Sequence, residues 1–267
     1  MEYGIDFDKI GTINVDFVVG LGEACRTAEA LKRNHLRYFS SPFDWMIIYS
    51  LDKVINLLEK IANGCKPDFF AECSENKNYA QGIYNGIVDN RNMMISMHDF
   101  PKHTDMDKAP RFFYLKYKYR FQNLNKLLKK ANKVCFLNYR KMSVDEMKTF
   151  VASVKQIYTF KQIYFINIFD SDEEALEQYD DNGAKYLIFK FSDEPKNELE
   201  KATNPHYWLG NINYWDRILS KIKLNKKFVY LYKLRRFIFH ISSECLSEEI
   251  LNVISILGMR FKVKNRL

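Results

Sequence analysis

The sequence contains few of the residues that are typical of linkers or of disulfide-rich folds. Only 10 glycines and 6 prolines occur among 267 residues, which argues against a linker-rich or sandwich-like chain. The five cysteines are an odd number and lie far apart, without a Cys-x-x-Cys pair: Cys25, Cys65, Cys73, Cys135 and Cys245. This pattern fits neither a disulfide framework nor a zinc site, and it indicates a reducing cytoplasm.

Signals for export or membrane insertion are also lacking. The first ten residues are acidic and contain no charged region followed by an apolar one, unlike a signal peptide. No apolar run approaches the length of a membrane span, and we find no repeat or low-complexity segment. We therefore expect a soluble cytoplasmic protein, with peripheral attachment to the inner membrane as the alternative location.

The overall composition is that of a globular protein with an excess of positive charge. Hydrophobic residues make up 47% and charged residues 28%, so disorder is not expected, and the length suits one α/β domain or two small ones. The net charge of +8 suggests nucleic acid, but no helix-turn-helix, zinc or RNA-binding signature accompanies it. We expect no nucleic-acid partner, because anionic lipid headgroups or phosphorylated substrates account for the charge equally well.

The apolar pattern predicts strands alternating with helices. From Val134 onward this alternation favours a parallel sheet covered by helices. Ser143 and Glu146 have the spacing of a capping box. The expected strands are 10–19, 93–97, 133–138, 162–169 and 186–191, with a hairpin around 79–88; the expected helices are 23–34, 51–61, 111–130, 145–158 and 216–222, and 172–179 is a helix or turn. We expect an α/β domain at 1–225 and a basic helical extension at 226–267.

Residues 18–45 contain the feature around which the rest is organised. An apolar strand leads into the turn Gly20-Leu21-Gly22, and Cys25 follows at the first turn of a helix. Unpaired backbone N–H groups and the helix dipole at such a position lower the pKa of a thiol, which suits a nucleophile. The alternative interpretation is that Cys25 is a small buried apolar residue.

The same stretch resembles a known family. The resemblance rests on Leu21-Gly22-x-x-Cys25, Leu31-Lys32-Arg33, Leu36-Arg37, Ser40, Pro42-Phe43-Asp44-Trp45, Met97-His98-Asp99-Phe100, Arg120-Phe121 and a late Trp208, Gly210, Trp215 element. These residues are similar to a bacterial family of uncharacterised proteins described as papain-like cysteine peptidases, often found with surface-polysaccharide genes. The resemblance spans roughly residues 13–220, and Gly20 departs from the usual serine. It implies a papain-like core with a central sheet flanked by helices.

The resemblance implies catalysis by Cys25 and His98. Acyl transfer needs a thiolate and an imidazole within hydrogen-bond reach, and the papain-like order is cysteine, histidine, then a polar residue. We select Asp44 as the third member, with Asn138 and Asp170 as alternatives, although Asp44 could instead cap the following helix. Asp99 adjoins His98, but neighbouring side chains on a strand face opposite ways. Backbone N–H groups of residues 23–25 would form the oxyanion hole.

The expected activity is thiol-based hydrolysis of a peptide. The alternatives are an acyltransferase that modifies a surface polysaccharide or glycolipid, and an inactive module that binds glycan or lipid. No cofactor is expected. No metal is expected either, because His98, His103 and Asp105 lack metal-site spacing, and His35 and His206 are predicted to be structural or solvated.

Two basic segments could be either ordinary structural elements or binding sites for an anionic partner. Arg111, Lys116, Lys118 and Arg120 are either a solvated helix face or include an arginine that binds a phosphate or carboxylate. The run Tyr230–Phe239 predicts either a terminal helix that covers the sheet or a basic helix that contacts an anionic membrane.

Overall fold

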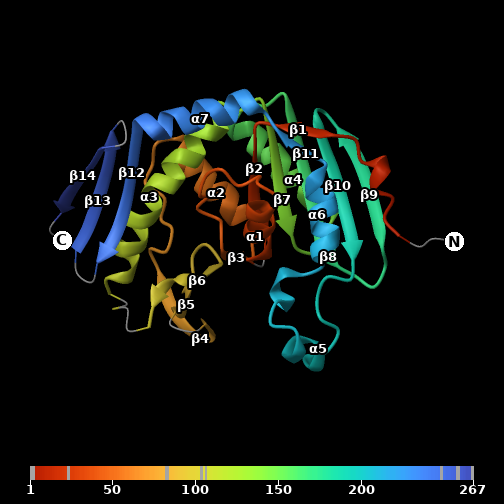
Figure 1. The fold of residues 1–267 in the computed structure, drawn as a ribbon, viewed down its shortest axis with the longest axis horizontal. Helices are drawn as coiled ribbons and strands as arrows, with labels where there is room; N and C mark the ends of the chain where they lie inside the picture. Colours follow the sequence, from red (N-terminus) through yellow and green to blue (C-terminus); the bar gives the residue numbers. More distant parts are fainter. Residues whose placement is uncertain are drawn as a thin grey trace. The chain divides into compact units, whose positions relative to one another are not determined.

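The computed structural model describes residues 4–22, 25–81, 84–102, 105, 107–246, 249–256 and 259–265 (Figure 1). The chain divides into two compact units, Met1–Lys223 and Leu224–Leu267. The first unit is mixed α/β, with a central mixed sheet flanked by helices, as the sequence predicted.

The central sheet organises the first unit. Its strand order is β2-β7-β8-β10-β9, with β2 (Phe17–Gly22), β7 (Lys133–Tyr139), β8 (Gln162–Asp170), β10 (Ala184–Phe191) and β9 (Ala175–Asp181). The first four are parallel, and β9 is antiparallel to β10. The parallel strands are rich in Val, Ile and Phe because both faces are covered. Their carboxyl ends therefore meet at one edge.

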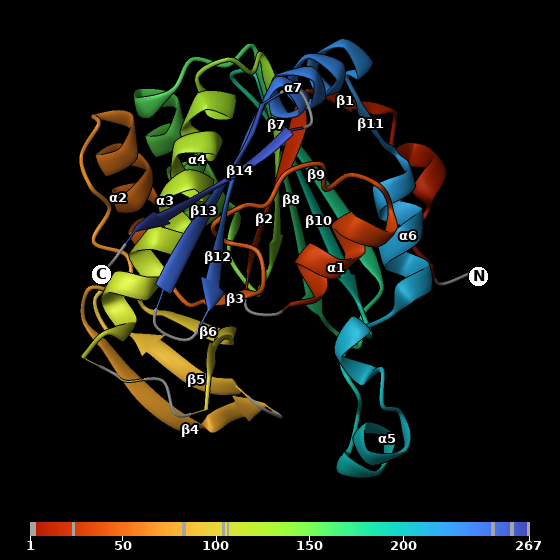
Figure 2. The ribbon, with the colours of Figure 1, turned by 60° about the vertical axis from the view of Figure 1, so that its left-hand side comes forward.

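Helices cover both faces of this sheet. Figure 2 shows α2, α3 and α4 on one face and α1 and α6 on the other. The helices of the first unit are α1 (Arg26–Arg33), α2 (Leu51–Ala62), α3 (Ala109–Leu128), α4 (Val144–Ile157), α5 (Glu198–Thr203) and α6 (Ile212–Ser220), with 3₁₀ turns η1 (Phe7–Lys9) and η2 (Tyr207–Leu209). The predicted capping box of α4 is confirmed: Glu146 N donates to Ser143 Oγ (3.2 Å), and Ser143 N donates to Glu146 Oε2 (2.7 Å).

A second, antiparallel sheet lies in the same unit. Its order is β3-β6-β5-β4, with β3 (Met46–Ile48), β6 (Met94–Pro101), β5 (Tyr84–Asp89) and β4 (Cys73–Gln81). The hairpin expected around 79–88 corresponds to β4 and β5. A short pair joins β1 (Ile13–Val15) to β11 (Ile222–Leu224).

Two local predictions of secondary structure in this unit are wrong. Residues 172–179 do not form a helix or turn, since Ala175–Asp181 is the edge strand β9. Gly20 and Gly22 lie inside β2 and not in a turn. Gly22 has φ +129°, and a Cβ there would lie 2.6 Å from the backbone nitrogen of Tyr139. The glycine is needed because β2 approaches β7 so closely.

The second unit combines one helix with a small sheet. Helix α7 (Lys226–Ile238) is followed by β12 (Phe239–Leu246), β13 (Glu249–Ile256) and β14 (Met259–Asn265), which pair antiparallel in that order. The sequence predicted a helical extension, whereas the structure has one helix, α7, followed by three strands. β13 is rich in β-branched residues and has a partner on each side, which favours strand over helix. Within the described ranges, no helix has both the length and the apolar character needed to cross a membrane.

Candidate active site

Cys25 lies where strand β2 passes into helix α1. It occupies the N-cap position, and α1 begins at the next residue. Its side chain is partly buried. Residues 23 and 24, which we expected to contribute to an oxyanion hole with Cys25, lie outside the described residues. The strand–helix junction therefore places the thiol at the carboxyl edge of the central sheet.

His98 reaches Cys25 from strand β6 of the other sheet. The distance from Cys25 Sγ to His98 Nε2 is 3.5 Å, although the residues are 73 positions apart. The ladder between β3 and β6 pairs Met46 with Ser96, so the turn that precedes β3 lies beside His98. The fold thus brings together the two residues that the sequence predicted as nucleophile and base.

Two aromatic rings flank the imidazole. The rings of Trp45 and Tyr84 each lie edge-on to His98, with centroids 6.3 Å away. The carbonyl oxygen of Trp45 lies 3.9 Å from Cys25 Sγ and is, beside His98 Nε2, a second acceptor within reach of the thiol. Trp45 has φ +65°, a left-handed conformation that is costly for a bulky residue and persists only where the surroundings enforce it. Trp45 therefore contacts both members of the pair.

Asp44 braces the turn that presents Trp45. Its buried Oδ2 accepts hydrogen bonds from Arg37 Nε and from the backbone nitrogen of Ser41, each at 2.8 Å. The pKa of Asp44 is raised because burial outweighs the opposing effect of Arg37. The alternative that Asp44 caps the following helix is wrong, since Ser50 caps α2.

The other candidates for a third member have different partners. Asn138 Nδ2 donates to Asn167 Oδ1 (2.7 Å) within the central sheet. Asp170 Oδ1 accepts from the backbone nitrogens of Asp193 and Glu194. Over the part of the chain that is described, no side chain, Asp44 included, makes a hydrogen bond to the second ring nitrogen of His98.

Asp99 adjoins His98 but points away from it. Its carboxylate accepts hydrogen bonds from Ser96 Oγ (2.6 Å) and Tyr117 OH (2.7 Å) and pairs with Lys116 Nζ (2.6 Å). Although burial opposes the shift, these partners lower the pKa of Asp99. Its negative charge favours the protonated form of His98 and disfavours the thiolate of Cys25. Asp99 therefore acts on the pair through space and not by a hydrogen bond.

Burial disfavours the charged forms of both the thiol and the imidazole. Burial raises the pKa of Cys25 to about 11, because its effect is larger than the opposing effects of the backbone hydrogen bond and of Arg26. Burial likewise lowers the pKa of His98 against the effect of Asp99. The sequence predicted that the helix start lowers the pKa of this thiol; in the structure the pKa is raised, because desolvation outweighs the backbone hydrogen bond and Arg26.

Arg26, next to Cys25, is a buried residue that the sequence analysis missed. It is only 3% exposed, and its guanidinium pairs with Asp193 and Glu194 (2.8 Å to Glu194) and donates to Tyr139 OH (2.9 Å). These partners follow or end strands β10 and β7. No local signal identifies the contact, because Asp193 is 167 positions away.

The late tryptophan–glycine element holds the partner of Arg26. Trp215 Nε1 donates to Asp193 Oδ1 (3.0 Å), and Trp215 is fully buried. Gly210 has φ +67°, and a Cβ there would lie 2.3 Å from the Asp193 carboxylate. Trp208 is partly exposed. The element is therefore linked to the cysteine region through Asp193 and Arg26.

In the described part of the first unit, no other histidine contacts Cys25 or His98. His35 and His206 are exposed, and His103 lies outside the described residues. In the described ranges, no three His, Cys, Asp or Glu side chains gather into a potential metal site. α3 is a single helix in which Lys116 pairs with Asp99 and Arg120 stacks on Tyr117 at 4.5 Å.

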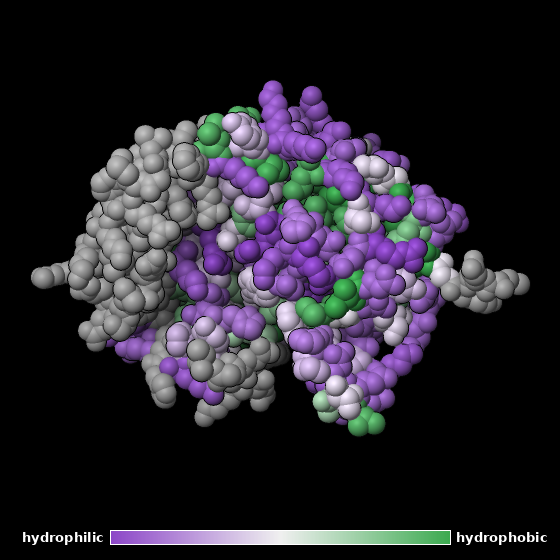
Figure 3. Space-filling model, viewed as in Figure 1, coloured by the Kyte–Doolittle hydropathy of each residue, from purple (hydrophilic) through white to green (hydrophobic). Residues whose placement is uncertain are grey.

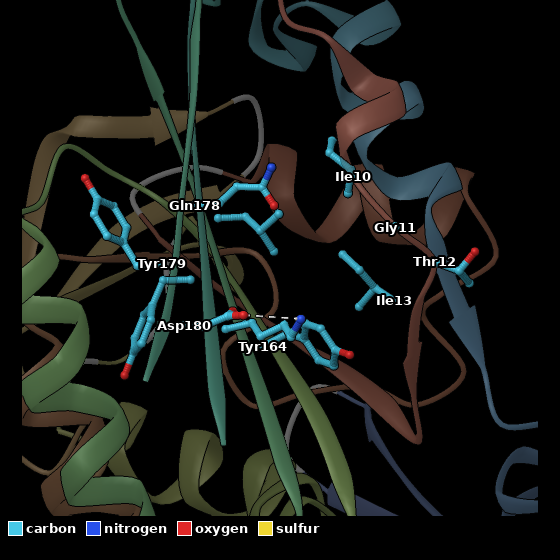
Figure 4. Close-up of a pocket in the computed structure, with 11 residues that line it drawn as sticks. Ile10, Gly11, Thr12, Ile13, Tyr164, Gln178, Tyr179 and Asp180 are labelled. Carbon is cyan, nitrogen blue, oxygen red and sulfur yellow. Dashed lines mark ion pairs between the residues drawn. The ribbon is translucent and has the colours of Figure 1, made fainter. Parts of the chain in front are cut away.

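A pocket of about 280 Å³ lies on the central sheet (Figure 4). Two of its lining residues, Lys185 and Asp180, form an ion pair (3.5 Å). Its lining is Ile10, Gly11, Thr12, Ile13, Tyr164, Gln178, Tyr179, Asp180, Lys185, Tyr186 and Leu187. These described residues include neither a thiol nor an imidazole, so the pocket is not a second site for thiol chemistry.

The chain was compared with known families, curated proteins and solved structures. Residues 16–161 match the model of the family described as "Putative papain-like cysteine peptidase (DUF1796)". The matched range includes Cys25, Asp44 and His98. No curated protein and no solved structure matches the chain.

Proposed function

The chain belongs to this family of papain-like cysteine peptidases, and from that membership we propose that it is a thiol hydrolase in which Cys25 is the nucleophile and His98 the general base. The observation that supports the proposal most directly is the 3.5 Å distance between Cys25 Sγ and His98 Nε2. A thiol at the start of α1 and an imidazole on β6 lie there within hydrogen-bond reach, which proton transfer requires.

Because the resting pair is uncharged, the reaction begins with a coupled proton transfer. As Sγ attacks the carbonyl carbon, its proton moves to Nε2 of His98 and the C=O π electrons move to the oxygen. The C–N bond then breaks, and His98 gives the proton to the leaving amine. A water molecule, deprotonated by His98, attacks the thioester, and the thiol is restored as the acid leaves. Asp99 stabilises the imidazolium that forms transiently.

Asp44 and Trp45 have a positioning role in this proposal. Asp44 holds the turn, and Trp45 contacts both Sγ and the imidazole. An acyltransferase would form the same thioester and differ only in passing the acyl group to a hydroxyl. The two activities are therefore separated by the acceptor, not by the first step.

The test is a paired assay of peptide cleavage and covalent trapping. A mixed peptide library is analysed by mass spectrometry, and a peptide carrying a Michael acceptor labels the thiol. We expect Cys25→Ala to abolish cleavage and labelling, and His98→Ala to reduce cleavage by roughly 10²–10⁴-fold. Cys65→Ala, at an exposed cysteine, should change neither.

Cleavage or labelling that survives in Cys25→Ala would overturn the proposal. A wild-type protein that neither cleaves peptides nor forms the adduct would do so as well. Acyl transfer to added sugar acceptors in place of hydrolysis would keep the thiol mechanism and replace the peptidase assignment.

A further inference from the structure

Helix α7 exposes large apolar side chains to solvent. Tyr230, Leu231 and Leu234 are 64%, 50% and 39% exposed. Tyr230 and Leu234 are four residues apart and so lie on one face of the helix, with Leu231 beside Leu234. A single exposed leucine is ordinary, whereas three large apolar residues within five positions form a contiguous patch.

Cations surround this patch. Lys226, Lys227 and Lys233 are exposed, and Lys226 and Lys227 precede Tyr230 and Leu231 by one helical turn. The sequence of α7 contains five Lys and Arg residues and no acidic residue. In Figure 3 hydrophilic and apolar residues lie next to each other over α7.

The charge of the whole C-terminal unit agrees with that of the helix. Residues 224–267 contain nine Lys and Arg against three Glu, a net charge of +6. The complete chain has a net charge of +8, so one sixth of the sequence accounts for most of it. A second copy of this unit would be repelled, and an anionic surface would be attracted.

We propose that the exposed face of α7 docks on an anionic phospholipid surface. Phosphate headgroups would pair with the lysines, and Tyr230, Leu231 and Leu234 would enter the boundary between headgroups and acyl chains. Nucleic acid would satisfy the same lysines but would leave the two leucines in water. The combination of both side-chain classes on one face therefore favours lipid.

Such docking depends on two contributions, and each can be removed separately. The electrostatic part is sensitive to salt and to the fraction of anionic lipid. The apolar part is insensitive to salt and scales with the buried area. The proposal is independent of the chemistry of Cys25, because binding to vesicles is measured without any substrate.

The experiment is co-sedimentation of the full-length protein with vesicles of phosphatidylcholine alone or mixed with phosphatidylglycerol. We expect binding only to the mixed vesicles, with release as salt is raised. Leu231→Ser with Leu234→Ser, and separately Lys226→Glu with Lys227→Glu, should each lower the partition coefficient by about tenfold or more. The first control is Leu199→Ser, at a leucine that is 73% exposed in α5. The second is Lys148→Glu with Lys161→Glu, which makes the same change in net charge at exposed lysines elsewhere.

The controls should bind as the wild type does, and circular dichroism verifies that every variant is folded. If Lys148→Glu with Lys161→Glu weakened vesicle binding as much as the α7 lysine variant does, net charge alone would explain the effect, and the assignment of α7 would be overturned. Absent binding to the mixed vesicles, or unchanged binding of the leucine variant, would overturn the proposal too. A nucleic-acid surface would be identified instead if RNA displaced the bound vesicles and the leucine variant still bound RNA as the wild type does.

Discussion

At the scale of single residues, the protonation state of Cys25 and His98 decides how the site responds to pH. A thiol pKa of about 11 places nearly all of the sulfur in the protonated form at neutral pH. The thiolate fraction at pH 7 is on the order of 10⁻⁴ for such a group. Reactivity toward a substrate must then come from proton transfer to His98 during attack, and not from a thiolate formed beforehand.

This predicts a distinct pH profile for alkylation. The rate of iodoacetamide modification at Cys25 should rise about tenfold per pH unit through neutral pH and level off only near pH 11, since only the thiolate reacts. Mass spectrometry of the Cys25 peptide follows the reaction, with Cys25→Ser as the blank. A plateau below pH 8 would instead show that a thiolate–imidazolium pair already exists in the resting protein.

Gly22 allows the close approach of β2 and β7 that sets the position of Cys25. Gly22→Ala would place a Cβ at φ +129° and 2.6 Å from Tyr139 N. We expect the free energy of unfolding to fall by about 1–3 kcal/mol or more, measured by urea denaturation. Gly11→Ala is the matched control, because nothing lies within 4 Å of its Cβ. Comparable losses in both variants would contradict the steric explanation.

At the scale of elements, the turn before β3 is the unit that couples Asp44 to the reactive pair. The buried carboxylate of Asp44 accepts hydrogen bonds from Arg37 and from the backbone nitrogen of Ser41. The next residue, Trp45, contacts Cys25 and His98. A bracing role and a direct role in orienting the imidazole give different results on mutation.

Asp44→Asn separates these two roles. We expect the free energy of unfolding to fall by about 1–3 kcal/mol, because Arg37 loses its buried partner. The activity should fall while the pH dependence of kcat/KM keeps its shape. Asp68→Asn, at an ion-paired carboxylate that touches neither Cys25 nor His98, is the control. A shifted pH profile with unchanged stability would make Asp44 the orienting partner of His98.

Helix α4 offers a test of local signals. Ser143→Ala should lower the free energy of unfolding by about 1 kcal/mol, because it removes the acceptor for Glu146 N. Ser153→Ala, in the interior of the same helix, should be neutral or slightly stabilising, since alanine is the better helix former there. Thermal denaturation of both variants measures the difference. A larger loss from Ser153→Ala would show that the cap is not a determinant of α4 stability.

The elements with strong periodicity were predictable from the sequence, and the exposed ones were not. The core strands β7, β8 and β10 are runs of Val, Ile and Phe, and α4 begins with a capping box. β9 is polar and largely exposed, so its strand conformation is decided by pairing with β10 and not by its own side chains. The strands after α7 depend on mutual pairing in the same way.

At the scale of the whole molecule, contacts between distant segments determine what surrounds Cys25. The resemblance singled out Cys25 and His98, but it gave no indication of the buried pair between Arg26 and Asp193. That pair joins the first helix to the segment after the last core strand, and it is set by topology. The carboxyl ends of β2, β7 and β10 meet at one edge, so residues more than a hundred positions apart become neighbours.

A double-mutant cycle on Arg26 and Asp193 tests this connection. Arg26→Met leaves the buried Asp193 carboxylate without its cation and should lower the free energy of unfolding by about 3–5 kcal/mol. Asp193→Asn should cost less, because Arg26 keeps the partly exposed Glu194 as an ion-pair partner. The double variant should lose less than the sum of the two single losses, because the buried Asp193 charge that Arg26→Met alone leaves unpaired is then absent. The exposed pair Lys185 and Asp180 is the control, and Asp180→Asn should cost below about 1 kcal/mol. Urea denaturation gives all four values. Additive losses would mean that Arg26 and Asp193 stabilise the fold separately and that no charged link joins α1 to the late segment.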